Sequence, residues 1–172
     1  METRPTSSNT ANELIARPLP PAPDVPADEL AARLQNIRRE MNADELDAIV
    51  LTDRKNIQYF TDFRSYSWYF NSRPFFVLIT NNDLILFGAT YERAHVDWKP
   101  RAFSGLYYDG YFEEGVACVA SAVRDRFKGS NPRIAIDYGE EMAGRGLLPL
   151  IDALRALSAR GELKTASPTL WR

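Results

Sequence analysis

The sequence contains few of the residues that most often carry enzyme chemistry. It has one histidine, His95, and one cysteine, Cys118, in 172 residues. A single cysteine excludes an internal disulfide, and its apolar neighbours indicate a buried small side chain rather than a reactive thiol. Metallohydrolases use clusters of His, Asp and Glu ligands. The sequence contains no H-E-x-x-H or C-x-x-C spacing and no phosphate-binding glycine loop. We therefore expect no catalytic residues, metal ligands or cofactor in this chain.

The chain also lacks a strong charge and a long apolar run. Its net charge is −2, whereas a nucleic-acid binder normally carries a basic surface. No apolar stretch is long enough to cross a bilayer, and the first 26 residues lack the apolar centre of a secretory signal. These features predict a cytoplasmic protein with no nucleic-acid or membrane partner.

The length and the composition are those of one globular domain preceded by an arm. Residues 1–26 are rich in proline, serine and threonine, and five prolines between Pro18 and Pro26 oppose regular structure there. The remaining residues, 27–172, are enough for a single domain with its own core. We predict a flexible arm over 1–26 and one domain over 27–172.

Hydrophobic periodicity predicts alternating helices and strands along the domain. A helix is expected from residues 27–29 to Asn42, with its arginines on a solvated face. Two strands, 75–80 and 83–88, flank the turn signal Asn81-Asn82 and form a hairpin. The other expected strands are 46–51, 105–109, 133–137 and 163–166, and the other expected helices are 56–60, 91–98, 112–127 and 147–157. The pattern predicts an α/β fold in three layers, with helices on both faces of a mixed sheet of about six strands.

The stretch from Asp47 to Thr80 is the most distinctive part of the sequence. A buried strand and a short helix, capped by Asp53, lead into the loop 64–73, which carries four aromatic residues and two arginines. Loops lie on the surface, so this composition favours contact with a ligand or with another protein surface.

This stretch resembles the N-terminal domain of the creatinase, prolidase and Xaa-Pro aminopeptidase family. The segment Asn56 to Phe63 fits the pattern N-x-x-Y-x-[ST]-x-F, and Arg73-Pro74 opens the next strand. Asp62 before Phe63 resembles creatinase more than prolidases, which usually have glycine there. The resemblance implies a ribonuclease-H-like topology and a parent protein that hydrolyses C–N bonds in a separate C-terminal catalytic domain. That domain holds two divalent metal ions in the peptidases and none in creatinase. Nothing here resembles it, so we expect a fragment or a truncated product that would partner its own catalytic domain.

The resemblance also implies the residues of a recognition site. In creatinase-like homodimers the corresponding loop reaches the active site of the partner subunit, where an aromatic residue and an arginine contact the carboxylate end of a small substrate. Arg73 matches that arginine, and Phe70 or Trp68 matches the aromatic residue. The other interpretation is that the loop only packs on a neighbouring domain.

Three acidic residues leave a second functional class open. Asp53 and Asp137 follow strands, Asp62 lies in the signature, and strand-end carboxylates can bind magnesium. A free-standing α/β binding protein or a small metal-dependent enzyme is therefore the alternative. We favour the simpler interpretation that Asp53 and Asp137 cap the helices that follow them.

Overall fold

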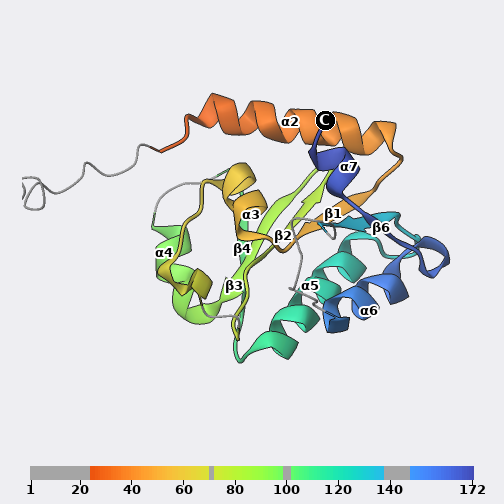
Figure 1. Cartoon of the computed structure of the whole chain (residues 1–172). Coiled ribbons are helices and arrows are strands. Elements are labelled where there is room, and N and C mark those ends of the chain that lie inside the picture. The colour runs from red at the N-terminus through yellow and green to blue at the C-terminus, as the bar shows by residue number, and fades with distance from the viewer. Residues whose placement is uncertain (1–23, 70–71, 99–101, 138–147) are drawn as a thin grey trace, which may run out of the picture.

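The fold is built on one mixed sheet of six strands (Figure 1). The computed structural model describes residues 24–69, 72–98, 102–137 and 148–172. The strand order is β4-β3-β2-β1-β5-β6. The strands are β1 (Ala48–Leu51), β2 (Phe76–Thr80), β3 (Leu84–Ala89), β4 (Ser104–Tyr108), β5 (Ile134–Ile136) and β6 (Leu163–Thr165). β2 is antiparallel to β1 and β3, and the other neighbouring pairs are parallel.

Helices cover both faces of this sheet (Figure 1). One face carries α2 (Ala27–Ala43), α3 (Arg54–Thr61), α4 (Arg93–Asp97) and α7 (Ser167–Leu170). The other carries α5 (Phe112–Arg126) and α6 (Leu148–Leu157). Short 3-10 turns lie at η1 (Tyr66–Tyr69), η2 (Thr90–Glu92) and η4 (Ala159–Gly161). The predicted three-layer α/β fold with a mixed sheet is confirmed.

The central strands are buried on both faces because both are covered by helices. In β1, Ile49 and Leu51 pack under α2 and α3, whereas Ala48 and Val50 face α5 and α6. This alternation is the two-residue period of a strand. It explains why β1 reads as a continuous apolar run rather than as alternating polar and apolar residues.

The helix α3 starts and ends as its sequence indicates. The Asp53 carboxylate accepts a hydrogen bond from the Lys55 backbone N–H at 2.8 Å, so the predicted cap is confirmed. The helix ends at Asp62, whose φ of +50° is left-handed. Phe63 then turns inward and is fully buried between the helices and the sheet.

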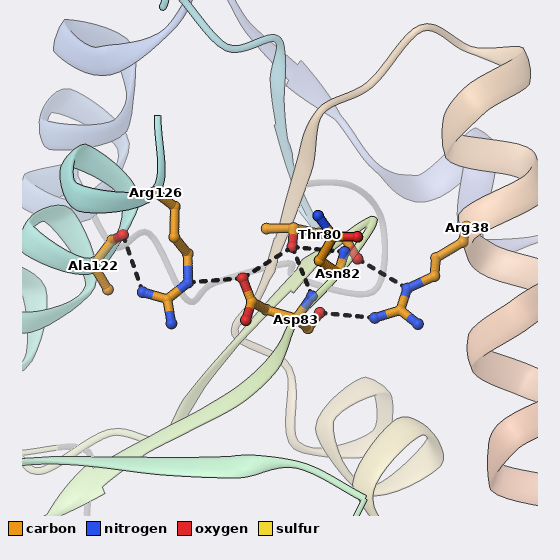
Figure 2. A network of polar contacts seen from close by, with 6 residues as sticks. All are labelled: Arg38, Thr80, Asn82, Asp83, Ala122 and Arg126. Carbon is orange, nitrogen blue, oxygen red and sulfur yellow. Dashed lines mark hydrogen bonds and ion pairs between the residues drawn. The ribbon is translucent and has the colours of Figure 1, made fainter. Parts of the chain in front are cut away.

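Two arginines of α2 are not simply solvated, contrary to the sequence-based expectation. Figure 2 shows Arg38 donating from Nε to the Thr80 carbonyl at 2.9 Å and from Nη2 to the Asp83 carbonyl at 3.2 Å. On the other side of the hairpin turn, Arg126 of α5 donates to the Asp83 carboxylate at 3.0 Å. Arg33 reaches α3 and donates to the Tyr59 carbonyl at 2.8 Å. These contacts tie both helical layers to the sheet, whereas Arg39 is exposed as expected.

The end of the chain forms a helix that the sequence did not predict. α7 lies against α2 (Figure 1), where the Thr169 hydroxyl donates to the Asp44 carboxylate at 2.6 Å. Arg172 pairs with both Asp44 and Glu40. The predicted arm lies almost wholly outside the described residues and stays a prediction. None of the helices in the described ranges is both long and apolar enough to span a bilayer.

Candidate recognition site

Arg73 lies just before β2 and is held without an acidic partner. Its Nε donates to the Gly110 carbonyl at 3.0 Å. Its guanidinium carbon lies 4.4 Å from the centroid of the Tyr111 ring and 5.6 Å from that of Tyr91. Aromatic faces at such distances attract a cation. Within the described parts of the chain the Arg73 Nη atoms have no hydrogen bond and the side chain has no ion pair.

The backbone around Arg73 is fixed by the end of β4 and the turn after it. The Tyr108 hydroxyl donates to the Pro74 carbonyl at 2.7 Å, and burial raises the pKa of Tyr108, which keeps this donor protonated. Gly110 has a φ of +109°, and a Cβ there would lie 2.6 Å from the Glu114 carboxyl group. Glycine is therefore needed at the residue whose carbonyl holds Arg73. Only the Nη edge of the guanidinium is left to take a further acceptor.

The two arginines of the loop have different surroundings. Arg64 pairs with the Asp62 carboxylate at 3.3 Å, and the same carboxylate accepts a hydrogen bond from the Val25 backbone N–H at 3.1 Å. Among the described residues the charge of Arg64 is thus balanced, whereas that of Arg73 is not. This contrast makes Arg64 a suitable control for experiments on Arg73.

Trp68 packs inward rather than standing free on the loop. Its ring lies 6.1 Å from that of Phe63 and 6.3 Å from that of Phe75, both with edge-on geometry. The indole N–H is buried and has no hydrogen-bond partner in the described structure. An unsatisfied buried donor costs about 1–3 kcal/mol, and an acceptor brought by a bound molecule would remove that cost. Phe70, the other predicted aromatic contact, lies outside the described residues.

A buried glutamate that the sequence did not single out anchors the start of the loop. Glu92 is only 5% exposed and accepts hydrogen bonds from Ser65, at 3.1 Å, and from Ser67. His95 lies on the exposed side of α4, as predicted, with Nδ1 3.3 Å from the same carboxylate. Both serines bond to Glu92 rather than to His95, so the group does not have the geometry of a Ser-His pair. No local sequence pattern distinguishes Glu92 from a surface glutamate.

Asp137 holds the turn between β1 and α3. The carboxylate is fully buried and accepts from the Thr52 N–H and hydroxyl, both at 2.8 Å, from the Asp53 N–H at 2.8 Å and from the Asn56 amide at 3.0 Å. Burial raises the pKa of Asp137 to about 6, and these hydrogen bonds act in the opposite direction. The residues directly after Asp137, 138–147, lie outside the described residues, so the expectation that Asp137 caps the following helix stays a prediction.

The described residues do not fit a metal centre. No three His, Cys, Asp or Glu side chains in the described ranges lie close enough together to hold an ion. Asp53 is engaged with Lys55, and Asp137 with the turn. We therefore derive no chemical step through a metal ion in this chain.

Comparison with known proteins gives a family match. The model of the creatinase/prolidase N-terminal domain matches residues 33–144, which is well over half of the chain. The chain belongs to this family. A comparison with curated protein sequences gives no match.

Solved structures with the creatinase/prolidase N-terminal fold overlay most of the chain. An Xaa-Pro aminopeptidase from Streptococcus thermophilus has a TM-score of 0.60 at 16% identity, covering 83% of this chain and 95% of that one. The N-terminal domain of an X-Pro dipeptidase from Streptococcus pyogenes gives 0.60 at 15%, covering 81% and 97%. A prolidase from Thermococcus sibiricus gives 0.63 at 12%, covering 82% of this chain and 35% of that one. At these identities the likeness establishes the fold.

The structure gives physical roles to the residues that carry the creatinase-like motif. Asn56 donates to Asp137 and so joins α3 to the end of β5. The Thr61 hydroxyl donates to the Ile57 carbonyl at 2.6 Å and accepts from the Phe63 N–H at 3.1 Å, which closes α3. Phe63 fills the core beneath the loop. The motif thus builds the base of the loop that leads to Arg73.

Proposed function

We propose that this chain is a non-catalytic substrate-recognition and dimerisation domain of a cytoplasmic creatinase- or Xaa-Pro-peptidase-type hydrolase. The observation that carries the proposal is the Nη edge of Arg73, which has no partner among the described residues. A guanidinium offers two parallel N–H donors to a carboxylate. Here one side of the group is held by Gly110, and the rings of Tyr91 and Tyr111 lie near it.

The substrate class follows from that geometry. An acceptor that uses both Nη atoms must present two oxygens side by side, as a carboxylate does. A small substrate with a free carboxylate satisfies this requirement. In the proposal Arg73 takes that end of the substrate, and Trp68 and Phe70 form an apolar wall beside it. Trp68 is half-buried, so part of its side chain is accessible for this contact.

In this proposed function, catalysis takes place in another domain, and that domain belongs to a partner copy of the protein. The described residues offer neither a metal cluster nor a Ser-His pair. Purified chain should therefore hydrolyse neither creatine nor Xaa-Pro dipeptides, with or without added manganese. Turnover that survives extensive purification and disappears with a substitution in this chain would contradict this part.

The recognition role is tested in a hydrolase assembled by joining this chain to a catalytic domain. Arg73→Ala should raise the activation free energy obtained from kcat/KM by about 2–4 kcal/mol, because a charged hydrogen bond to substrate is lost. This lowers kcat/KM roughly 30-fold to 1,000-fold. The matched control Arg64→Ala removes an arginine whose charge Asp62 already balances, and it should change kcat/KM little. Wild-type kinetics for Arg73→Ala in an intact dimer would remove the substrate role and leave only the interface role.

A further inference from the structure

A polar groove opens at the amino-terminal ends of β5 and β6, at the far side of the sheet from β4. Its volume is about 380 Å³, which holds several water molecules or one small ligand. One wall comes from the α2–β1 turn and the residues before β5, and the other from η4 and β6. The charged and amide side chains that line it are Glu45, Asn131, Arg133, Arg160, Glu162 and Lys164.

One backbone hydrogen bond joins the two walls of the groove, and two hydrogen bonds hold the first wall together. The Ala159 N–H donates to the Pro132 carbonyl at 2.8 Å, which fixes η4 against the segment before β5. The Arg133 N–H donates to the Asp47 carboxylate at 2.7 Å, and the Asp47 N–H donates back to the Arg133 carbonyl at 2.9 Å. The groove is therefore a built feature of the fold.

The positive charges in the groove are not balanced equally. Arg133 pairs with Glu45 at 2.6 Å and lies 3.7 Å from the Asp47 carboxylate. Arg160 and Lys164 are exposed and form no ion pair or hydrogen bond within the described residues. Lys164 does lie near Asp44, whose pKa is lowered by the Thr169 hydroxyl, by Arg172 and, least, by Lys164. Glu162 is the remaining acid of the lining. Three cationic side chains, Arg133, Arg160 and Lys164, thus share the groove with two acidic ones, Glu45 and Glu162.

The backbone of the groove is strained at two charged residues. Glu45 has a φ of +56° and Arg160 a φ of +58°, and in the described chain Asp62 is the one further non-glycine residue with positive φ. A left-handed conformation costs an ordinary residue about 1–2 kcal/mol, and glycine avoids this cost. Strain of this kind gathers at functional sites. At Arg160 a guanidinium occupies a position that glycine would fill with less strain.

We propose that this groove binds a small oxyanion, a phosphate or a carboxylate, between the Arg160 guanidinium and the Lys164 ammonium group. The guanidinium takes two oxygens of the anion in its plane, and the ammonium group takes a third acceptor or the same oxygens from the side. Arg133 is not needed as a counter-ion because Glu45 and Asp47 already balance it. This site involves none of the residues around Arg73, so it does not depend on the proposed function.

Nuclear magnetic resonance of the ¹⁵N-labelled chain tests the proposal. Potassium phosphate and sodium succinate are titrated separately, with sodium chloride at equal ionic strength as the reference. We expect at least one of the two anions to cause saturable shifts, in the millimolar range, of the Gly161, Glu162 and Lys164 amides. The anion that saturates identifies the source of the oxyanion. Shifts that stay linear for both anions, or that sodium chloride reproduces, would overturn the proposal.

Arg160→Gly separates binding from folding. Glycine adopts the left-handed backbone freely, so the Tm should be equal to or higher than that of the wild type, while the affinity for the anion falls about tenfold or more. Arg155→Ala on α6 is the matched control, because that arginine is exposed and pairs with Asp152 outside the groove. It should leave anion affinity unchanged. Wild-type affinity in Arg160→Gly, or a Tm well below that of Arg155→Ala, would show that Arg160 has a structural role only.

Discussion

Asp137 and Arg73 are two ionisable side chains that lie next to the central strands, and they differ in burial and in hydrogen bonding. Both oxygens of Asp137 accept hydrogen bonds from the β1–α3 turn, and the side chain is fully buried. Arg73 is half-buried, with one hydrogen bond and two aromatic neighbours, and its Nη edge is open. The groups that surround Asp137 would lose their partner if it were removed. Removing Arg73 would cost the Gly110 carbonyl its one hydrogen bond from the Arg73 side chain, at a partly exposed position. We therefore assign Asp137 to folding and Arg73 to recognition.

Removal of the Asp137 carboxylate should cause the largest loss of folding stability. Asp137→Ala leaves the Thr52 and Asp53 N–H groups and the Asn56 amide without their acceptor. Each unsatisfied buried donor costs about 1–3 kcal/mol, so we expect a loss of about 3–5 kcal/mol in the free energy of unfolding. Urea denaturation measures it. Arg73→Ala should change the same quantity by less than about 1 kcal/mol. Equal losses of stability in the two variants would contradict the assignment of Asp137 to folding and of Arg73 to recognition.

The pH dependence of folding stability tests the raised pKa of Asp137. Burial raises its pKa from 3.8 to about 6, and two pH units correspond to about 3 kcal/mol. The folded chain binds this proton more tightly than the unfolded chain, so the contribution is fully present below about pH 4 and lost as the pH rises through about 6. The stability of the wild type relative to Asp137→Asn should therefore fall by about 3 kcal/mol between pH 4 and pH 7. A difference that stays constant with pH would contradict the raised pKa.

A charge-conserving substitution tests the role of Arg73 in carboxylate recognition. Arg73→Lys keeps the positive charge but replaces the two parallel donors with a single ammonium group. We expect affinity for a carboxylate ligand to fall by about 2 kcal/mol, close to 30-fold, with little change in Tm. Isothermal calorimetry on the assembled hydrolase, with Arg64→Lys as the control, measures the loss. If Arg73→Lys binds as well as the wild type, charge alone is sufficient and the planar geometry is irrelevant.

The smallest expected effect concerns the two tyrosines near Arg73. The Tyr111 ring is the nearer, at 4.4 Å against 5.6 Å for Tyr91. Cation–π contacts at exposed sites contribute about 0.5–1 kcal/mol, so Tyr111→Leu should weaken carboxylate binding by about twofold to fivefold. Tyr91→Leu should weaken it less. A larger effect for Tyr91 would mean that the guanidinium lies differently when the ligand is bound.

Local signals were sufficient for most of the fold. The apolar run of β1, the Asn81-Asn82 turn and the Asp53 cap each depend on a few neighbouring residues, and each was predicted. Helical periodicity predicted the helix over 112–127, and in α5 Val116, Val119 and Val123 lie on its buried side. Such patterns are readable because period and capping act within one or two turns of chain.

The contacts around the candidate site could not be read in this way. Glu92 holds two serines that precede it by 27 and 25 residues, and the acceptor of Arg73 is 37 residues away at Gly110. α7 depends on Asp44, which lies 125 residues before Thr169. Arg33 and Arg38 look solvated on a helical wheel because the wheel does not show the strands and helices beside them. The chemistry of the loop was visible in its composition, but its partners are set by the tertiary fold.

The proposed recognition function requires Arg73 to bind a carboxylate through its Nη atoms, and one titration tests this directly. The ¹⁵N-labelled arginine side chains are followed while Gly-Pro, and separately its C-terminal amide, is added to the assembled hydrolase with its catalytic residues inactivated. We predict that Gly-Pro shifts the Arg73 side-chain resonances saturably, that the amide shifts them far less, and that those of Arg64 stay unchanged. Equal responses to Gly-Pro and its amide, or no response of Arg73 to Gly-Pro while the ligand is demonstrably bound, would contradict the account.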